Sequence, residues 1–268
     1  MGNAYIGTSG WNYDHWSKGE FYPRDLKPSE WLKFFAAHFS TVEINNSFYS
    51  LPGEITFQNW RTQVPPGFIF AVKASRFLTH IKRLRDPEDP LALFFSHAKY
   101  LKDRLGPVLF QLPPRFRVNL ERLEIFLSAL KPYITKTRAR CVMEFRDASW
   151  LAPPVFDLMR RYGVAVCFAD WGGMPVTDPV TGDFVYVRRH YGDAGGGNYS
   201  KKALNSDVAQ IRTWMNDGLD VYMYFNNDMQ GHAIRNAKYV QQAVANAGSG
   251  KRRRVAGSAR RQSFSKSS

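Results

Sequence analysis

The sequence lacks the features that mark secreted or membrane-bound proteins. No apolar run approaches the roughly 20 residues that a membrane-spanning helix needs. The N-terminal stretch MGNAYIGTSG has neither the charged nor the apolar region of a signal peptide, and Ile6 breaks the pattern for N-myristoylation. These absences predict a soluble, cytoplasmic protein with no membrane partner.

Cysteine is scarce, with two residues in a chain of 268. Cys141 and Cys167 both lie within apolar, strand-like runs, which is typical of buried, reduced side chains in a reducing compartment. The sequence therefore does not favour a disulfide or a shared metal ion between them.

Three motifs that would define a reaction are also missing. The first apolar run continues as GTSGWNYDHW, which lacks the G-x-G-x-x-G spacing of a dinucleotide-binding turn and leads into aromatic residues instead of a helix. The chain contains no H-E-x-x-H metal motif and no G-x-S-x-G nucleophile elbow. A dinucleotide-binding open sheet and a serine-based triad are therefore disfavoured.

What the chain does contain is a large apolar and aromatic fraction, with 7 Trp, 13 Tyr and 20 Phe. This composition is that of a globular protein, and the length allows one large domain or two small ones. The alternation of strands and helices favours a single domain over residues 1–247. Residues 248–268 carry seven of the 14 net positive charges and no acid. Their Gly, Ser and Arg content predicts a disordered basic tail, which either has no partner or makes a weak, salt-sensitive contact with nucleic acid or an anionic surface.

Eight short apolar runs recur along the chain. Apolar residues occupy both faces of each run until a polar end, which is typical of buried parallel strands. The runs are AYIGTSG (4–10), TVEINNSFY (41–49), FIFAVKAS (68–75), PVLFQLPP (107–114), RCVMEFR (140–146), VAVCFAD (164–170), FVYVRRH (184–190) and VYMYFNN (221–227).

Helical patterns lie between most of these runs, with Asn119 and Ser206 as expected N-caps for two of them. The patterns cover residues 28–39, 89–103, 119–131, 153–163, 206–218 and 232–248. Eight strands alternating with helices predict an α/β fold of the TIM-type (β/α)8 class. The connection between strands 6 and 7, residues 171–183, shows no helical pattern, so its helix is expected to be missing or very short.

Polar residues gather at the carboxyl ends of the runs. If these residues face the barrel interior, the inward set is Glu43, Asn45, Lys73, Gln111, Glu144, Arg146, Asp170, Arg188, His190 and Asn226. By the same alternation of side chains along each strand, Cys141 and Cys167 are expected to point outward. Any one of the polar residues could instead be structural, for example in an ion pair of Glu43 with Lys73 or of Glu144 with Arg188. Polar ends on seven of eight strands instead predict a site at the C-terminal mouth of the barrel, where TIM barrels build their active sites.

The residue types indicate the chemistry of this site. Cationic side chains pair with phosphate or carboxylate, so the cations near the mouth favour a small polar or anionic ligand; these are Lys73, Arg76, Arg146, Arg188 and Arg189. Aromatic residues in the same loops offer faces on which a sugar or a base can stack; these are Trp11, Tyr13, Trp16, Phe48, Tyr49, Trp150 and Trp171. Asn45, Gln111 and Asn226 are expected to orient the ligand.

Glu43, Glu144, Asp170 and His190 are the candidate catalytic groups, as acid–base partners. The same groups could instead hold a divalent ion, but one inward histidine without a ligand motif does not favour a metal. The sequence therefore leaves the cofactor unknown and assigns no metal ligand.

Eight motifs occur in order between about Tyr5 and Ala247: GTSGWNYDHWSKGEFYP, FSTVEINNSFYSLP, FAVKASRFLTH, LGPVLFQLPPRF, MEFRDASW, ADW, YVRRH and YFNND. Together they resemble the domain of unknown function 72, or YecE-like, family. The resemblance implies a TIM-type barrel with a polar pocket at the strand ends, and it implies no settled reaction. Tyr191 departs from the family, which tends to have a glycine after the histidine.

Three functions agree with these features. The first is an enzyme that uses acid–base chemistry on a polar or phosphorylated substrate, sugar-like or nucleotide-like, at the barrel mouth. The second is a nucleic-acid-associated barrel, either a repair-type enzyme or a non-catalytic binder, and the third is a barrel that binds a metabolite without turnover. The sequence determines neither the reaction class nor the oligomeric state.

Removal of residues 248–268 tests whether the tail binds nucleic acid. If it does, the truncated protein binds a short DNA duplex more weakly than the full chain at low salt. The slope of log affinity against log salt then flattens by roughly 0.9 for each phosphate that the tail neutralises. Fluorescence anisotropy at several salt concentrations measures both quantities, and equal affinities and slopes would show that the tail does not bind DNA.

Overall fold

The computed structural model describes the backbone of residues 1–171 and 179–261, and side chains up to residue 246. Eight parallel strands form one sheet in the order β1-β8-β7-β6-β5-β4-β3-β2. Each strand overlaps one of the eight predicted runs. The strands are β1 (Ala4–Thr8), β2 (Thr41–Ile44), β3 (Ile69–Lys73), β4 (Leu105–Gln111), β5 (Cys141–Glu144), β6 (Ala165–Ala169), β7 (Phe184–Arg189) and β8 (Asp220–Phe225).

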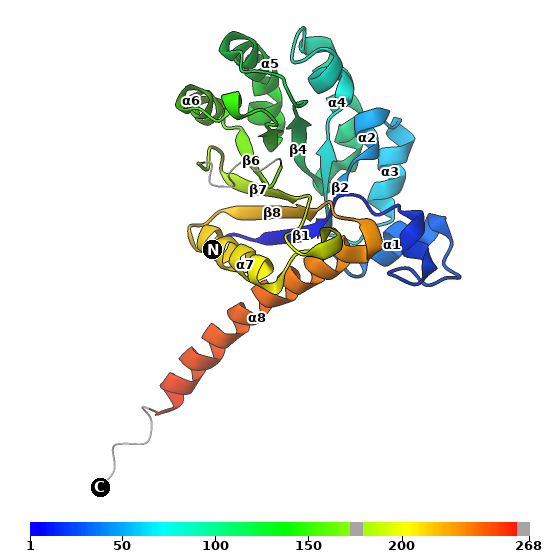
Figure 1. Cartoon of the computed structure of the whole chain (residues 1–268), viewed down its shortest axis with the longest axis vertical. Coiled ribbons are helices and arrows are strands. Elements are labelled where there is room, and N and C mark those ends of the chain that lie inside the picture. Colours follow the sequence, from blue (N-terminus) through cyan, green and yellow to red (C-terminus); the bar gives the residue numbers. More distant parts are fainter. Residues whose placement is uncertain (172–178, 262–268) are drawn as a thin grey trace.

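Helices surround the strands, as Figure 1 shows, so the predicted TIM-type barrel is confirmed. They are α1 (Trp31–Ala36), α2 (Asn46–Tyr49), α3 (Glu54–Thr62), α4 (Glu88–Ala98), α5 (Leu120–Thr137), α6 (Pro153–Tyr162), α7 (Lys201–Asn216) and α8 (His232–Arg261). Between β6 and β7, the described residues contain no helix; positions 172–178 lie outside the described part of the chain.

Three helical features differ from the sequence prediction. Both α2 and α3 were missed, because α2 spans a single turn and the apolar residues of α3 are few. The helix α7 begins at Lys201 instead of near Ser206, since the Ser200 hydroxyl accepts a hydrogen bond from the Ala203 amide and caps the helix earlier. The predicted cap Asn119 is confirmed, accepting a 2.8 Å bond from the Arg122 amide.

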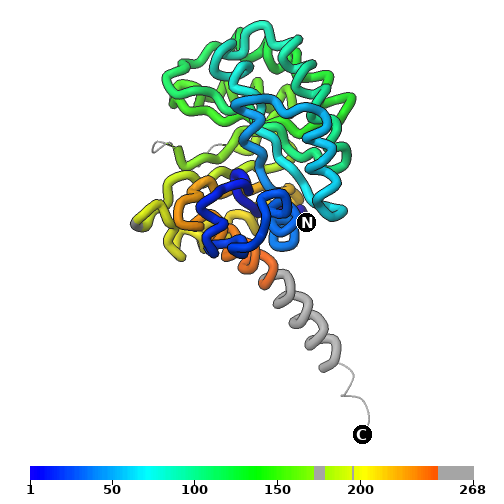
Figure 2. The backbone as a smooth tube through the Cα atoms, turned by 90° about the vertical axis from the view of Figure 1, so that its right-hand side faces the viewer, coloured from blue at the N-terminus to red at the C-terminus, as the bar shows by residue number. Residues whose placement is uncertain are grey.

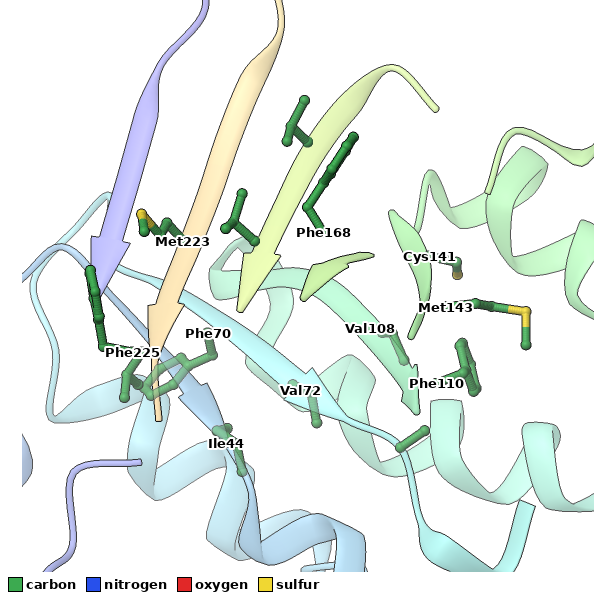
Figure 3. Close-up of a cluster of buried hydrophobic side chains, with 14 of the residues drawn as sticks. Ile44, Phe70, Val72, Val108, Phe110, Cys141, Met143, Phe168, Met223 and Phe225 are labelled. Atoms are coloured by element: carbon green, nitrogen blue, oxygen red, sulfur yellow. The ribbon is translucent and has the colours of Figure 1, made fainter. Parts of the chain in front are cut away.

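Apolar side chains on the outer face of the strands pack beneath the helices. Figure 3 shows this layer, which includes Ile44, Phe70, Val108, Met143 and Met223. A second, smaller apolar cluster fills the barrel interior and supports the mouth from below. Its members are Ala71, Leu109, Val142, Ala165, Cys167, Ala169, Phe184, Tyr186, Tyr222 and Tyr224.

The prediction of which residues face the barrel interior was wrong for one strand, β6. Cys167 belongs to the interior cluster with Ala165 and Ala169, so β6 presents its odd-numbered residues to the barrel interior. Asp170 lies one residue beyond the end of β6, where the chain leaves the barrel wall, and counting from this residue shifted the register by one. Cys141 points outward as expected, and both cysteines are buried and free.

The loop after the first strand and the loop after the last strand meet beside the barrel mouth. The turn η1 (Asp14–Lys18) contacts the turn η7 (Met229–Gly231), and the Trp16 indole nitrogen donates a 2.9 Å hydrogen bond to the Asp228 carbonyl. Figure 2 shows this as the blue N-terminal segment lying beside the orange start of α8. This contact helps to hold the β1 and β8 loops at the mouth together.

The helix α8 packs against β1 and α7 and continues to Arg261. The predicted basic tail thus falls partly on this helix and partly on residues 262–268, outside the described part of the chain. Whether the tail is disordered in solution stays a prediction. Within the described residues, no helix has the length and apolar character needed to cross a membrane.

The barrel closes between β1 and β2, where the two backbones come close together. Ser9 bridges to Glu43 in parallel pairing, and the Gly10 amide donates a 2.8 Å bond to the Glu43 carbonyl. At Gly7 a β-carbon would lie 2.3 Å from the Thr41 carbonyl oxygen, so this position has no room for a side chain.

Gly7→Ala tests this closure. The added methyl group would force the β1 and β2 backbones apart, so we expect the free energy of unfolding to fall by about 1–3 kcal/mol. Gly53→Ala is the control, because nothing lies within 4 Å of its β-carbon position, and it should change stability by no more than about 0.5 kcal/mol. Urea denaturation measures both; equal effects would argue against a tight β1–β2 contact.

Candidate functional site

A pocket of about 880 Å³ opens at the C-terminal mouth of the barrel. Residues at or after the ends of all eight strands contribute to it. The lining residues are Gly10, Trp11, Asn12, Tyr13, Pro28, Ser29, Leu32, Asn45, Asn46, Phe48, Tyr49, Trp60, Gln63, Lys73, His80, Gln111, Arg146, Trp171, Arg188, His190 and Asn226. Among the described residues, three cationic side chains line the pocket and no Asp or Glu does.

A buried ion-pair network forms the base of the pocket. The Arg188 guanidinium, on β7, donates a 2.6 Å bond to Glu144 Oε2 on β5 and a 2.8 Å bond to Glu43 Oε1 on β2. Both glutamates are 0% exposed. Ser9 and Tyr186 each donate a further 2.6 Å bond to the Glu43 carboxylate. Arg188 therefore connects β2, β5 and β7 across the barrel.

The two carboxylates of this network are held ionised. Burial alone would raise the pKa of Glu43, but the charge of Arg188 and the hydrogen bonds from Ser9 and Tyr186 outweigh burial and lower it. For Glu144, Arg188 and then Arg146 likewise outweigh burial, and its pKa falls well below the usual range. Neither carboxylate can take up a proton near neutral pH.

Arg146 extends from the ion-pair network at the bottom of the pocket to the pocket wall. Its Nε donates a 2.7 Å bond to Glu144 Oε1, and its guanidinium carbon lies 3.6 Å from the centroid of the Trp171 ring. Its two terminal nitrogens donate to no other described residue. This geometry fixes the plane of the guanidinium and leaves its outer edge for a ligand.

Lys73 is the pocket cation without a carboxylate partner among the described residues. Its amine lies 3.9 Å from the centroid of the Phe48 ring, and no ion pair within 4 Å involves it. Burial, followed by the positive charge of Arg188, lowers the pKa of Lys73 to about 7. A substantial fraction of this amine is therefore neutral at physiological pH.

His190 lies at the end of β7, beside Arg188. Its backbone amide donates a 2.7 Å bond to Asp170 Oδ1, and its ring Nδ1 lies 3.1 Å from the Asn226 side-chain nitrogen. Burial and the charge of Arg188 lower the pKa of His190 to about 4. The imidazole is therefore neutral at pH 7 and can accept a proton only weakly.

Two amide side chains in the pocket have unsatisfied oxygen atoms. Gln111 Oε1 and Asn45 Oδ1 are buried and accept no hydrogen bond from any described residue. Gln111 is 3% exposed, and both residues line the cavity. A buried acceptor without a donor is costly, so these oxygens favour a ligand with hydroxyl or amine donors.

Most of the predicted ligand-binding residues do line the pocket: Trp11, Tyr13, Asn45, Lys73, Gln111, Arg146, Trp171, Arg188 and Asn226. Of the four catalytic candidates, His190 lines it, whereas Glu43 and Glu144 lie beneath it. Asp170 does not line the pocket; its carboxylate accepts hydrogen bonds from the His190 backbone amide and from the Tyr199 hydroxyl.

Arg76, Trp150, Trp16 and Arg189 are not among the residues that line the pocket. Trp16 is buried against Asp228, and Arg189 pairs with Asp207. Arg76 is exposed at the start of the turn after β3. Trp150 is 0% exposed, stacks on Phe145 at 5.2 Å and donates to the Phe116 carbonyl, so it packs in the core.

Sequence reasoning missed Ser9 and Tyr186, the two other donors to Glu43, and His80, which lines the pocket. Tyr186 shares the inward phase of Arg188, and this signal could have found it. Among the described residues, no group of three or more His, Cys, Asp or Glu is placed to hold a metal ion.

Comparison with known proteins agrees with this architecture. The model of the family described as "Protein of unknown function DUF72" matches residues 5–260. UPF0759 protein YunF of Bacillus subtilis is 28% identical over 266 residues, covering 87% of this chain and 92% of its own. A DUF72 family protein of Thermotoga maritima has a TM-score of 0.78 at 27% identity, covering 91% of this chain and 99% of its own.

The barrel is also similar to a sugar epimerase. The structure of D-psicose 3-epimerase with D-tagatose, from Clostridium cellulolyticum, has a TM-score of 0.54 at 10% identity. The likeness covers 92% of this chain and 99% of the epimerase chain, and at this identity it shows the fold alone.

Glu144→Gln tests the buried network. The substitution removes a charge that Arg188 and Arg146 share, so at pH 7 we expect the free energy of unfolding to fall by on the order of 3 kcal/mol. Because the folded pKa of Glu144 lies below its ordinary 4.5, its contribution is present above that pH. The difference in free energy of unfolding between wild type and variant should therefore become smaller as the pH falls below 4.5 toward the folded pKa.

Urea denaturation between pH 7 and pH 3 measures both effects. Glu124→Gln is the matched control, because Glu124 pairs with Arg161 on the surface, and it should change stability by no more than about 0.5 kcal/mol. A Glu144→Gln protein as stable as the control at pH 7 would contradict a network that supports the fold.

Proposed function

This chain belongs to the DUF72 family, and since that membership names no reaction, we propose its function from the pocket: the barrel mouth binds a small, polar, anionic compound, and the protein is an enzyme that acts on it by proton transfer. One observation carries the proposal. Lys73, Arg146 and Arg188 line the pocket, and no acidic side chain of the described residues does. An anion gains from this field, whereas a cation would be repelled.

The charges of the network leave an excess of positive charge at the pocket surface. The carboxylates of Glu43 and Glu144 balance two cations, and Arg188 uses both terminal nitrogens on them. With Lys73 protonated, one positive charge remains uncompensated among these groups. The outer edge of Arg146 is therefore the direct contact for a carboxylate or phosphate at every pH, Lys73 adds a second contact while it is protonated, and Arg188 acts as a fixed charge behind them.

The rest of the lining suits a hydroxylated compound. Trp11, Tyr13, Phe48, Tyr49, Trp60 and Trp171 provide aromatic faces on which the C–H groups of a sugar can pack. Gln111 and Asn45 offer acceptors for hydroxyl groups. The same fold carries the sugar epimerase described above, which is compatible with a sugar-like substrate.

The proton carriers of this proposal are Lys73 and His190. A general base works best when its pKa lies near the operating pH, and Lys73, at about 7, meets this condition. Glu43 and Glu144, expected from the sequence to be the acid–base pair, become positioning residues instead. They orient Arg188 and Arg146, because both remain ionised and fully paired.

A thermal-shift screen of sugar phosphates, sugar acids and their neutral parent sugars tests the proposal. An anionic compound that binds raises the melting temperature by mass action, and its neutral parent should not. We expect the shift to disappear in both Lys73→Met and Arg146→Met. Without ligand, Lys73→Met should melt at or above the wild-type temperature, because it removes a cation that burial disfavours.

Lys99→Met is the control, since this lysine is exposed on the outer surface, and it should keep the full ligand shift. For any substrate found, kcat/KM should rise with pH through about 7 as Lys73 loses its proton. Equal ligand shifts in wild type, Lys73→Met and Arg146→Met would refute an anion site at the barrel mouth.

A further inference from the structure

The environment of Lys73 is that of a nucleophilic amine. The side chain is half-buried at the end of β3, and its nitrogen lies 3.9 Å from the Phe48 ring centroid, where an apolar face replaces solvent. The nearby carboxylates are both engaged with Arg188, so neither forms an ion pair with the lysine. Desolvation and a neighbouring cation are the two conditions that activate a lysine for attack on a carbonyl group.

We propose that Lys73 forms an imine with the carbonyl carbon of a small anionic aldehyde, ketone or 2-oxo acid bound in this pocket. This inference rests on the proposed function, because the anion contact at Arg146 is what brings the carbonyl compound to the amine. It adds a substrate class, since proton transfer alone does not require a carbonyl group.

The step balances without any further reactant. The neutral amine of Lys73 attacks the carbonyl carbon, a C–N bond forms, and the carbonyl oxygen takes up the proton that the nitrogen loses, giving a carbinolamine. This oxygen then accepts a second proton and leaves as water, while the nitrogen lone pair forms the C=N bond. Overall, the ammonium form and the carbonyl compound give a protonated imine and water, and total charge is conserved.

The surroundings suit the protonated imine better than the starting ammonium ion. The imine keeps one positive charge, but it spreads that charge onto carbon and has fewer N–H groups that need hydrogen-bond partners beside the apolar Phe48 ring. A protonated imine acidifies the neighbouring C–H bonds. The neutral imidazole of His190, a weak base that lines the same pocket, is the candidate acceptor of that proton.

The nucleophile is tested first with formaldehyde, which needs no recognition by the pocket. Limiting formaldehyde and cyanoborohydride methylate amines through an imine, at a rate set by the neutral fraction and access of each amine. At pH 7 we expect Lys73 to be methylated several-fold faster than Lys238, as measured by peptide mass spectrometry. Lys238 is a matched internal control, because it is also half-buried and lies 5.0 Å from the Phe21 ring centroid, outside the pocket.

The substrate class is tested with pyruvate and dihydroxyacetone phosphate in the presence of sodium borohydride. We expect at least one probe to form an adduct at Lys73 whose mass equals that of the probe less one oxygen atom. Lys73→Arg keeps the positive charge and lacks the amine, so it should form no adduct while keeping the thermal shift caused by the probe. Lys238→Arg should form the adduct as the wild type does.

The outcomes separate this inference from the proposed function. Thermal shifts with both probes in wild type and Lys73→Arg, without an adduct in either, would overturn the imine and leave the anion site standing. Methylation of Lys73 no faster than that of Lys238 would overturn the imine whatever the ligand. An adduct at Lys73 that is equally abundant in Arg146→Met would support the nucleophile and contradict the anion site.

Discussion

The buried guanidinium of Arg188 is the interaction on which the barrel mouth depends. It joins carboxylates on β2 and β5 to β7, so three strands that are not neighbours in the sheet meet at one charge. Removing three charges from water is costly, and full pairing is what makes their burial tolerable. Since Ser9 and Tyr186 complete the shell of Glu43, the network also fixes where β1 meets β2.

The same charge sets the chemistry above it. Burial, and after it the charge of Arg188, lowers the pKa of both Lys73 and His190, so an amine near pKa 7 and a neutral imidazole share one pocket. The carboxylates remain ionised beneath, and Glu144 holds Arg146 in its place on Trp171. The polar groups thus form two layers, an ion-paired layer that supports the fold and an upper layer that faces the ligand. The second layer contains Lys73, which has no carboxylate partner among the described residues, and the Gln111 side-chain oxygen, which accepts no hydrogen bond from them.

Much of the site could be predicted from the alternation of residues along the strands. Glu43, Lys73, Gln111, Glu144 and Arg188 do point into the barrel, because a parallel strand buried on both faces still alternates its side chains. The alternation gave the wrong direction for β6, because the prediction started from Asp170, one residue beyond the strand, where the chain no longer follows the pleat. It also failed to exclude Trp150, since an aromatic residue in a loop reads the same whether it faces a pocket or packs on Phe145.

By itself the sequence determined the strand order along the chain, the TIM-type barrel and the end of the barrel where polar groups gather, because these follow from local periodicity. Only the tertiary structure decided which charges pair. From the sequence, Glu43 and Glu144 could be either catalytic acids or members of structural ion pairs. In the structure both are bound to Arg188, which is separated from each of them by many residues. Pairing and desolvation depend on distances across the barrel, and these, not residue type, decide which group is ionised and which is free to react.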